Sequence, residues 1–529
     1  MADTYDIAIV GMGPVGCAAA ILFSHNGLRV VCIERDLDVY SLPRAVAMDG
    51  EIVRAFQAVG LGQQLDDLLQ TVREGDRAGF ANSKREWLFG HDMADGGSNG
   101  WQPLSMFDQP EVETFLRSQA INHPNVTSYI GYEFESFDDH GDQVHLKASQ
   151  INTNQSENAR SNRDGVIDIS ARYVLACDGA NSKIRRTLNI EWDNLGYDHD
   201  WLVVDIIIKD GHTLNNDTVQ VCDPDRITTY VVTKDPYRRW EFKLNPGETW
   251  DEMLQVEKIE QLIEPWTPKG SYEIRRSAVY QFHAATAKSW RVGNVFIAGD
   301  AAHQTPPFLG QGMNAGMRDA INLAWKFQMV IKGEADESLL DAYQQERLPH
   351  AQDLVEWAVD IGQLMEHLAA VEDAERNGKA VPEAVHKKKS SGYGQGRSNP
   401  PLRDGVLMLG QVDDTGSSGY LFSQPLVQRG GKAFKLDEEL GRGFSIVAKS
   451  ESDIKLNKES RRIIDRFGIT VSSLEGLELV KGKFDNLFKN ANAAIIRPDH
   501  YVFGHTTNEI TLDDLLRALS STLASSDTK

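Results

Sequence analysis

The N-terminal stretch of this chain constrains its fold more than any other. Residues 7–10 form a compact apolar run, which predicts a buried parallel strand, and the letters GMGPVG follow at 11–16. A small-residue helix is expected over 17–26 and a second strand over 28–33, ending at Glu34. This order is a βαβ unit with G-x-G-x-x-G in its first turn and an acid about twenty positions on. It predicts a Rossmann-like domain that binds a dinucleotide.

The residue types in this unit have separate roles. Gly11, Gly13 and Gly16 let the backbone turn tightly and approach a pyrophosphate. Glu34, which precedes Arg35, can bridge the hydroxyls of an adenosine ribose. An acid at this point favours a ribose without a 2′-phosphate, so FAD or NAD is expected rather than NADP.

A second stretch places a carboxylate before a helix. Residues 295–298 predict a short buried strand, which Gly299 and Asp300 end at a tight turn. After a proline-stiffened loop, apolar residues repeat at helical spacing from Gly312 to a stop at Gly333. The carboxylate can accept from sugar-like hydroxyls, and the helix N-terminus can hold an anion. The alternative is an ordinary strand-to-helix connection.

A third strand, over 173–177, also ends in an acid and a glycine, Asp178 and Gly179. Beyond it the pattern changes to alternation, which predicts an antiparallel sheet suited to walling a pocket. The alternating segments are 201–208, 218–222, 228–233, 239–244 and 272–282. A basic, Gly/Ser/Pro-rich linker over 386–402 then leads to a smaller α/β domain over 403–529.

Composition excludes several classes of partner. A formal net charge of −22 argues against nucleic acid and anionic membranes, because the long-range field repels both. The four cysteines are scattered, without a CxxC pair or a His/Cys cluster, so no metal site is predicted and reduced cytoplasmic thiols are favoured. The N-terminus lacks the pattern of a signal peptide, and no run is long enough to span a bilayer. We expect a cytoplasmic protein.

Taken in order, the three strand-end motifs resemble those of the single-component FAD-dependent aromatic hydroxylases (group A flavoprotein monooxygenases), which include para-hydroxybenzoate hydroxylase and phenol hydroxylase. Shorter matches are similar to 3-(3-hydroxyphenyl)propionate hydroxylases, at 43–45, 222–224, 239–242, 246–249 and 316–320. The tail around 496–502 looks like the thioredoxin-like C-terminal domain of the phenol-hydroxylase branch. It contains no cysteine, so a structural role or a dimer contact is expected there instead of redox activity.

The resemblance implies an α/β fold: a Rossmann-like FAD-binding domain, an inserted antiparallel substrate sheet and a C-terminal thioredoxin-like domain. The expected FAD-binding domain is discontinuous, over 1–75, 105–188 and 283–385. The substrate sheet is expected over 76–104 and 189–282. The oligomeric state stays open, a homodimer included.

The implied reaction is hydroxylation of a phenol. In such enzymes NADH or NADPH reduces the FAD, and dioxygen then gives a flavin C4a-hydroperoxide that oxidises the ring. Substrates like 3-(3-hydroxyphenyl)propionate are favoured. Two alternatives remain: the same chemistry on a bicyclic substrate such as a hydroxyquinolone or polyketide, and a flavin-binding protein without hydroxylase activity.

The resemblance also assigns the cofactor site. Backbone donors at the helix start would stabilise the negative charge of reduced flavin. Arg44 is a phosphate partner or, alternatively, a surface ion pair, and Asp178 would lie near the diphosphate or the nicotinamide donor. The complete expected set is Gly11, Gly13, Gly16, Glu34, Arg35, Arg44, Gln109, Asp178, Gly299, Asp300, Gly312, Met313 and Asn314.

For catalysis the resemblance points to Asp49, which would take or orient the phenol proton, and to Pro306, which would border the flavin and the substrate. The alternative for Asp49 is a helix N-cap. Expected substrate contacts are Tyr230, Arg239, Tyr280, Pro307 and Phe308. The first three can equally be sheet structure, because alternation does not say which face is inward. His303 is expected to be a packed histidine.

Overall fold

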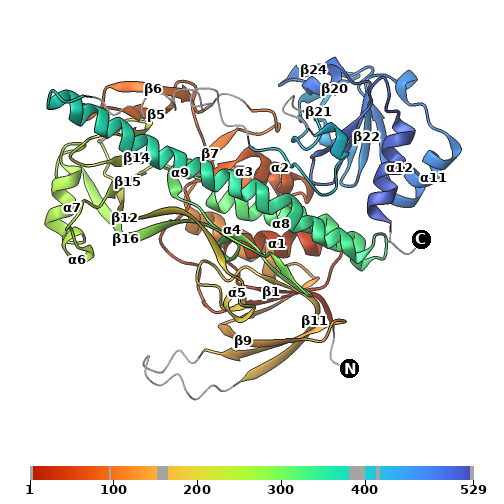
Figure 1. The fold of residues 1–529 in the computed structure, drawn as a ribbon, viewed down its shortest axis with the longest axis horizontal. Coiled ribbons are helices and arrows are strands. Elements are labelled where there is room, and N and C mark those ends of the chain that lie inside the picture. The colour runs from red at the N-terminus through yellow and green to blue at the C-terminus, as the bar shows by residue number, and fades with distance from the viewer. Residues whose placement is uncertain (1–3, 95–96, 152–164, 381–398, 413–416, 525–529) are drawn as a thin grey trace.

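The computed structural model describes residues 4–94, 97–151, 165–380, 399–412 and 417–524. The expected α/β class is confirmed (Figure 1). The predicted linker over 386–402 lies mostly outside the described residues.

The first sheet is the Rossmann-like one. Its parallel strands run in the order β18-β11-β1-β2-β8, and their apolar residues are buried as a parallel sheet requires. The short strand β17 forms one edge, and β9 and β10 extend β11 as an antiparallel pair. The strands are β1 (Tyr5–Val10), β2 (Val30–Glu34), β8 (Val126–Ile130), β9 (Tyr132–Asp139), β10 (Val144–Gln150), β11 (Val166–Ala176), β17 (Arg291–Val292) and β18 (Val295–Ile297).

The strand order explains why three distant motifs meet. Strands β1, β11 and β18 are neighbours and parallel, so their carboxyl ends lie along one edge of the sheet. That edge carries Gly11, Asp178 and Gly299. Helix α1 (Pro14–His25) contacts both α4 (Gln109–Ile121) and α8 (Gly312–Ile331). Ligands bind at the carboxyl edge of open α/β sheets.

The second sheet has the order β19-β16-β12-β15-β14-β13-β5-β6. It is antiparallel as predicted except that β13 pairs with β5 in parallel, which makes the sheet mixed. Alternation cannot set the direction of β5, because this strand comes from a separate segment of the chain. The strands are β5 (Arg77–Ala81), β6 (Trp87–Asp92), β12 (Trp192–Ile208), β13 (Thr218–Val221), β14 (Thr228–Val232), β15 (Tyr237–Lys243), β16 (Tyr272–Ala287) and β19 (His303–Gln304).

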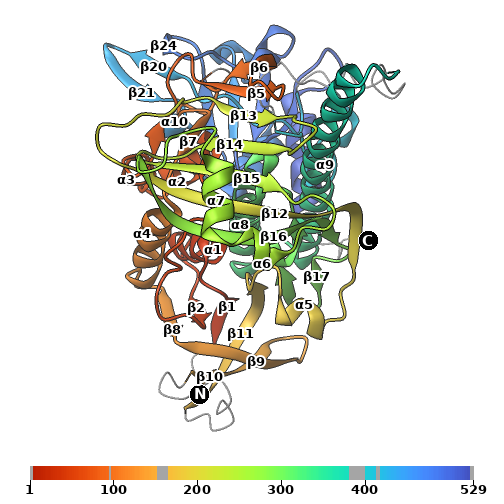
Figure 2. The same ribbon diagram turned by 90° about the vertical axis from the view of Figure 1, so that its left-hand side faces the viewer.

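One face of this sheet packs on two helices. The buried cluster there contains Trp240 and Phe242 from the sheet and Met253, Ile259 and Ile263 from α6 (Trp250–Met253) and α7 (Val256–Ile263). Figure 2 shows α6 and α7 over this face. The other face therefore looks back toward the Rossmann-like sheet.

Smaller elements connect the two sheets. One of them is a three-stranded sheet in the order β3-β7-β4. In the sequence, β3 comes before the helices α2 and α3, and β4 and β7 come after them. The long helix α9 runs from the C-terminal part to the second sheet (Figure 1). The bounds are β3 (Ala47–Asp49), α2 (Gly50–Ala58), α3 (Gly62–Asp66), β4 (Gln70–Thr71), β7 (Leu104–Met106), α5 (Lys183–Thr187) and α9 (Ala342–Arg376).

The C-terminal part has the thioredoxin-like arrangement expected for it. Its main sheet runs β23-β22-β25-β26, with only β22 and β23 parallel, and a second sheet runs β21-β20-β24. The strands are β20 (Leu426–Arg429), β21 (Lys432–Lys435), β22 (Ser445–Ala448), β23 (Thr470–Ser473), β24 (Glu478–Lys481), β25 (Ala493–Ile496) and β26 (Val502–His505). The helices are α10 (Asp437–Leu440), α11 (Lys458–Phe467) and α12 (Leu512–Leu523).

Candidate active site

A single cavity of about 830 Å³ extends from the carboxyl edge of the first sheet to the polar face of the second. Pro14 and Asp300 line it at the first sheet, and Arg239 and Tyr280 line it at the second. Asp49, at the end of β3, lines it between the two. The cavity therefore joins some of the predicted cofactor residues to predicted substrate and catalytic residues, whereas Gly13, Glu34 and Asp178 are not among its lining residues.

The glycines of the first turn allow close backbone contacts. Gly11 has a φ of +96°, and a Cβ there would lie 2.4 Å from Cys177 O. A Cβ on Gly16 would lie 1.9 Å from Gly11 O, whereas the space beside Gly13 is open to 4 Å. Gly11 and Gly16 are thus required for packing, and Gly13 leaves room for a ligand to approach the backbone.

Glu34 is held in place by the backbone around it. One carboxylate oxygen accepts from Met12 N at 2.5 Å and the other from Asp36 N at 2.6 Å. Arg35 points elsewhere: its side chain is 61% exposed and pairs with Asp36. The structure therefore keeps Glu34 beside the glycine turn and does not bring the Arg35 side chain to the cavity.

The Gln109 side chain accepts hydrogen bonds from the backbone at Arg44 and Ala45. Its Oε1 accepts from Arg44 N at 2.8 Å and from Ala45 N at 2.7 Å. The Arg44 guanidinium lies 4.9 Å from the ring centroid of Tyr40, and Arg44 lines the cavity. The alternative of a surface ion pair is not seen for Arg44, for which no salt bridge is found among the described residues.

The helix start at α8 offers free donors beside a free carboxylate. The N–H groups of Gly312, Met313 and Asn314 have no acceptor within the described chain, as expected at a helix N-terminus. Asp300 lines the cavity and makes no side-chain hydrogen bond or ion pair with any described residue. The Asn314 side chain is engaged elsewhere, since it accepts from Asp49 N at 3.1 Å.

Asp178 has one oxygen bound and one buried without a partner. Its Oδ2 accepts from Lys183 N at 2.8 Å and Ile184 N at 3.2 Å, at the start of α5. Its Oδ1 has no hydrogen-bond partner within the described chain. A buried carboxylate oxygen without a protein donor at this sheet edge suits a ligand that has a hydrogen-bond donor.

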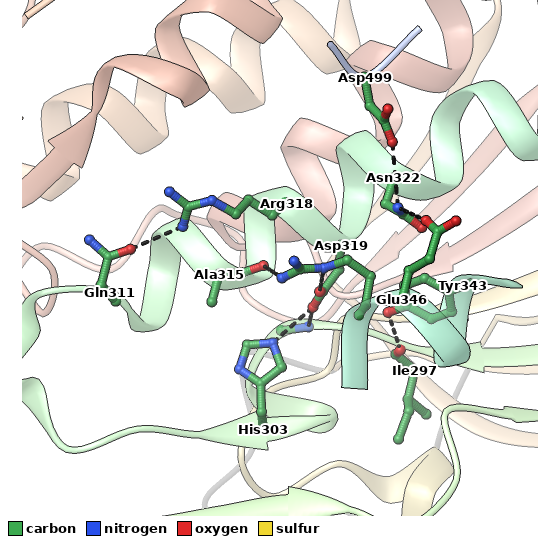
Figure 3. A network of polar contacts seen from close by, with 12 residues as sticks. Ile297, His303, Gln311, Ala315, Arg318, Asp319, Asn322, Tyr343, Glu346 and Asp499 are labelled. Atoms are coloured by element: carbon green, nitrogen blue, oxygen red, sulfur yellow. Dashed lines mark hydrogen bonds and ion pairs between the residues drawn. The ribbon is translucent and has the colours of Figure 1, made fainter. Parts of the chain in front are cut away.

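A buried network fixes the turn at Gly299 against α8 (Figure 3). Asp319 accepts from Gly299 N at 3.0 Å and from His303 Nε2 at 2.9 Å, and its other oxygen accepts from Arg347 Nε at 2.9 Å. Burial alone would raise the pKa of Asp319, but His303 and Arg347 lower it below its ordinary value. Sequence reasoning missed Asp319 and Arg347, although the match at 316–320 contained the first of them.

Asp49 is buried, faces the cavity and is paired with a cation. It accepts from Gln311 Nε2 at 3.2 Å and forms an ion pair with Arg318. Asp49 stands at the N-cap position of α2, yet its side chain makes no capping hydrogen bond. The N-cap alternative therefore does not account for this carboxylate.

Of the proline-loop residues, Pro307 and Phe308 line the cavity. Pro306 directly precedes the 3₁₀ turn Pro307–Leu309 and is not among the lining residues. Phe308 packs with its ring centroid 5.2 Å from that of Trp201, which fixes this wall.

The second sheet divides its predicted contacts between two faces. Arg239 and Tyr280 line the cavity, whereas Tyr230 lies on the opposite face, against Trp240 and Trp266. The Tyr230 hydroxyl donates to Asn215 O at 2.7 Å. Neighbouring residues of a strand face opposite sides, so Thr229 and Val231 take the cavity positions of β14 instead. Sequence reasoning also missed Glu241, which lines the cavity.

The described residues contain neither of two other kinds of site. None of their helices combines the length and apolarity needed to cross a lipid bilayer. They also contain no group of three or more His, Cys, Asp or Glu side chains arranged to hold a metal ion.

Comparison with family models gives two matches. An FAD binding domain model matches residues 4–358, and an HcaD C-terminal domain model matches residues 419–522. The first covers the Rossmann-like sheet, the second sheet and the N-terminal half of α9.

Curated relatives cover most of the chain. A probable NADH-specific resorcinol 4-hydroxylase of Rhodococcus jostii is 32% identical over 98% of this chain and 95% of its own length. A 3-(3-hydroxy-phenyl)propionate/3-hydroxycinnamic acid hydroxylase of Klebsiella pneumoniae is 32% identical over 84% of this chain and 78% of its own.

Two solved structures share the whole fold. Aklavinone-11 hydroxylase, in a complex with FAD and aklavinone, has a TM-score of 0.76 at 22% identity and covers 99% of this chain and all of its own. The flavin-dependent monooxygenase PieE, with FAD and substrate, has a TM-score of 0.78 at 17% identity and covers 99% of both chains.

Proposed function

This chain belongs to the FAD-binding family of flavin-dependent aromatic hydroxylases, and we propose that it hydroxylates a small single-ring phenol with electrons from NADH. The choice of NADH rests on the Rhodococcus relative, whose name states that specificity. Phenols like resorcinol or 3-(3-hydroxyphenyl)propionate, the substrates named for the relatives, are the first candidates.

The residues at the sheet edge fit FAD. Glu34 and the open side of Gly13 suit the adenosine and diphosphate, and Asp300, which has no side-chain partner among the described residues, suits the hydroxyls of the ribityl chain. The free N–H groups at Gly312 and Met313 suit the anionic edge of the reduced ring. Bound FAD supplies the redox chemistry: it accepts a hydride and activates dioxygen.

One observation carries the proposal: Asp300, Asp49 and Arg239 line the same cavity. A phenol between the flavin side and the second sheet lies within reach of a buried carboxylate. Asp49 forms an ion pair with Arg318 and faces the cavity, so this group accepts the hydrogen bond of the phenol hydroxyl and orients the ring.

The size of the cavity favours a small aromatic substrate over a multi-ring polyketide. A volume of about 830 Å³ has to hold the flavin as well as the substrate. Pockets for one drug-sized ligand span about 300–1,000 Å³ by themselves. A polyketide of several fused rings would compete with the flavin for this space, whereas a hydroxyquinolone is about as large as 3-(3-hydroxyphenyl)propionate and is left to the turnover test.

Two finer points complete the proposal. The thioredoxin-like part has no cysteine, so a role in a homodimer contact fits it better than redox chemistry. The four cysteines are free, which supports a cytoplasmic location. Light scattering of the purified protein measures whether it is a dimer, and cell fractionation measures whether it is cytoplasmic.

The test is turnover by the purified holoprotein. NADH and NADPH oxidation are followed with resorcinol, 3-(3-hydroxyphenyl)propionate and a hydroxyquinolone, and products are identified by mass. We expect NADH oxidation to accelerate with a single-ring phenol and a product heavier by one oxygen. A protein that binds FAD but oxidises neither donor with any phenol would instead be the non-hydroxylating flavoprotein.

A further inference from the structure

The cavity wall formed by the second sheet carries one buried carboxyl group without a partner. Glu241, in β15, is only 3% exposed and lines the cavity. Its strand neighbours Trp240 and Phe242 belong to the buried cluster on the opposite face. The side chain of Glu241 therefore points into the cavity.

The other buried charges on this wall are two guanidinium groups that share one carboxylate, Asp205. Arg239 binds Asp205 at 2.7 Å, and its remaining donors reach Arg44 O at 2.6 Å and Pro43 O at 3.0 Å. Arg276 also pairs with Asp205 and donates to the hydroxyl of Tyr280. Glu241, by contrast, makes no side-chain hydrogen bond within the described chain.

Glu241 stands in a row of polar groups. Across the sheet, Gln220 pairs with Thr229, Thr229 with Glu241, and Glu241 with Val203. Thr229 Oγ1 donates to Gln220 Oε1 at 2.5 Å, which leaves the amide nitrogen of Gln220 as a donor beside the cavity. The wall thus offers an acceptor at Glu241 and a donor at Gln220.

A buried carboxyl without donors is costly, and a ligand that supplies an O–H removes the cost. We infer that Glu241 binds a second hydroxyl on the substrate ring, so that this chain selects dihydroxybenzenes of the resorcinol type over phenols with a carboxylate side chain. This inference rests on the proposed function and narrows it. The sequence favoured 3-(3-hydroxyphenyl)propionate-like compounds, but the two arginines that would hold a carboxylate are already paired.

Charge supports the same choice. Burial raises the pKa of Glu241 to about 7, and Arg239 opposes this shift. Above that pH the ionised carboxylate is a stronger acceptor for a hydroxyl donor, and its charge offsets the excess positive charge of the arginines that would attract a substrate carboxylate. Resorcinol is neutral at this pH and has donors on both sides of its ring.

The experiment measures binding by holoenzymes. Dissociation constants for resorcinol, phenol and 3-(3-hydroxyphenyl)propionate are taken from the change in flavin absorbance, for wild type, Glu241→Leu and Glu241→Gln. Glu273→Gln is the matched control, because Glu273 is an exposed acid of the same sheet that pairs with Lys209 at 3.8 Å. FAD content and thermal melting report whether each variant folds.

We expect wild type to bind resorcinol about tenfold or more tightly than phenol, as a charge-assisted hydrogen bond implies. Glu241→Leu should remove that preference and change phenol binding by less than about threefold. Glu241→Gln keeps the volume of the side chain but replaces the carboxylate by a weaker, neutral acceptor. It should therefore reduce the preference for resorcinol over phenol in part, and improve the binding of 3-(3-hydroxyphenyl)propionate. Glu273→Gln should behave as wild type.

An unchanged ratio of resorcinol to phenol affinity in Glu241→Leu would overturn the inference, as would a wild type that prefers the propionate. If Glu241→Leu fails to fold, Glu241→Gln takes its place, and an unchanged ratio of resorcinol to phenol affinity in that variant would overturn the inference. If either of these outcomes overturns the inference, hydroxylation of phenols by the wild type would still support the proposed function. A wild type that hydroxylates no phenol would remove the proposed function and this inference together.

Discussion

Tyr501, in the C-terminal part, donates a hydrogen bond from its hydroxyl to Glu51 Oε1 at 3.0 Å, across 450 positions of sequence. The other Glu51 oxygen accepts from Arg318 Nε at 2.7 Å, and Arg318 pairs in turn with Asp49. All four side chains are buried. A part of the chain that lacks cysteine thus reaches the candidate catalytic carboxylate through two intervening residues.

Tyr501→Phe tests this connection. Removing the hydroxyl should cost about 1 kcal/mol of unfolding free energy, the usual value of one hydrogen bond. It should also lower the hydroxylation rate by about threefold to tenfold, since a small displacement of Asp49 is costly in rate. Stopped-flow measurement separates hydroxylation from flavin reduction, which should stay unchanged. Tyr132→Phe, a half-buried tyrosine in β9, is the control, and an equal effect in both variants would contradict the connection.

Asp49→Asn tests the catalytic role. Glu51 still balances Arg318 in this variant, so we expect the fold and the FAD content to persist. The amide is a poor proton acceptor, and the rate of hydroxylation should fall by about 100-fold or more. The measurement is product formed per NADH oxidised, across pH. Unaltered product yield would assign Asp49 to structure alone.

Asp300→Asn tests the cofactor site. The carboxylate has no side-chain partner within the described chain, so the melting temperature of the apoprotein should not change. Its loss should weaken FAD binding by about tenfold or more, because charge-assisted hydrogen bonds to the ribityl hydroxyls become neutral ones. Fluorescence titration with FAD measures this, with Asp193→Asn, an exposed acid of β12, for comparison. Equal FAD affinity in the two variants would move the cofactor away from Asp300.

Glu241→Gln should change the pH dependence of stability. The folded pKa of about 7 lies above the ordinary value of 4.5, so the folded state is penalised when Glu241 ionises. The penalty is absent below pH 4.5, grows as the pH rises and is complete above pH 7, where it reaches about 3 kcal/mol at most. Urea unfolding without substrate should show the variant more stable than wild type at pH 8 and equal to it near pH 4.5. A difference that does not vary with pH would speak against ionisation of this group.

The residues of the candidate cofactor site that lie at strand ends could be placed from the sequence because the pattern that places them is local. Gly11, Asp178 and Asp300 each follow a buried strand, and strands of this type lie parallel with their carboxyl ends together. The substrate wall could not be predicted in the same way. Tyr230 and Thr229 are adjacent in the sequence, but Tyr230 lies on the helix-covered face and Thr229 on the cavity face. The alternating pattern of the strand does not say which of the two faces borders the cavity.

The sequence by itself determined the strand ends, the glycine turns and the helix start at Gly312, because these depend on the backbone preferences of adjacent residues. Only the tertiary structure decided which charges are matched. Asp49 pairs with Arg318 and Arg239 pairs with Asp205 across long stretches of chain, while Glu241 forms no hydrogen bond or ion pair with the residues that the structure describes. Ion pairing depends on distance in space, and a chain that folds into several sheets does not preserve distance along the sequence.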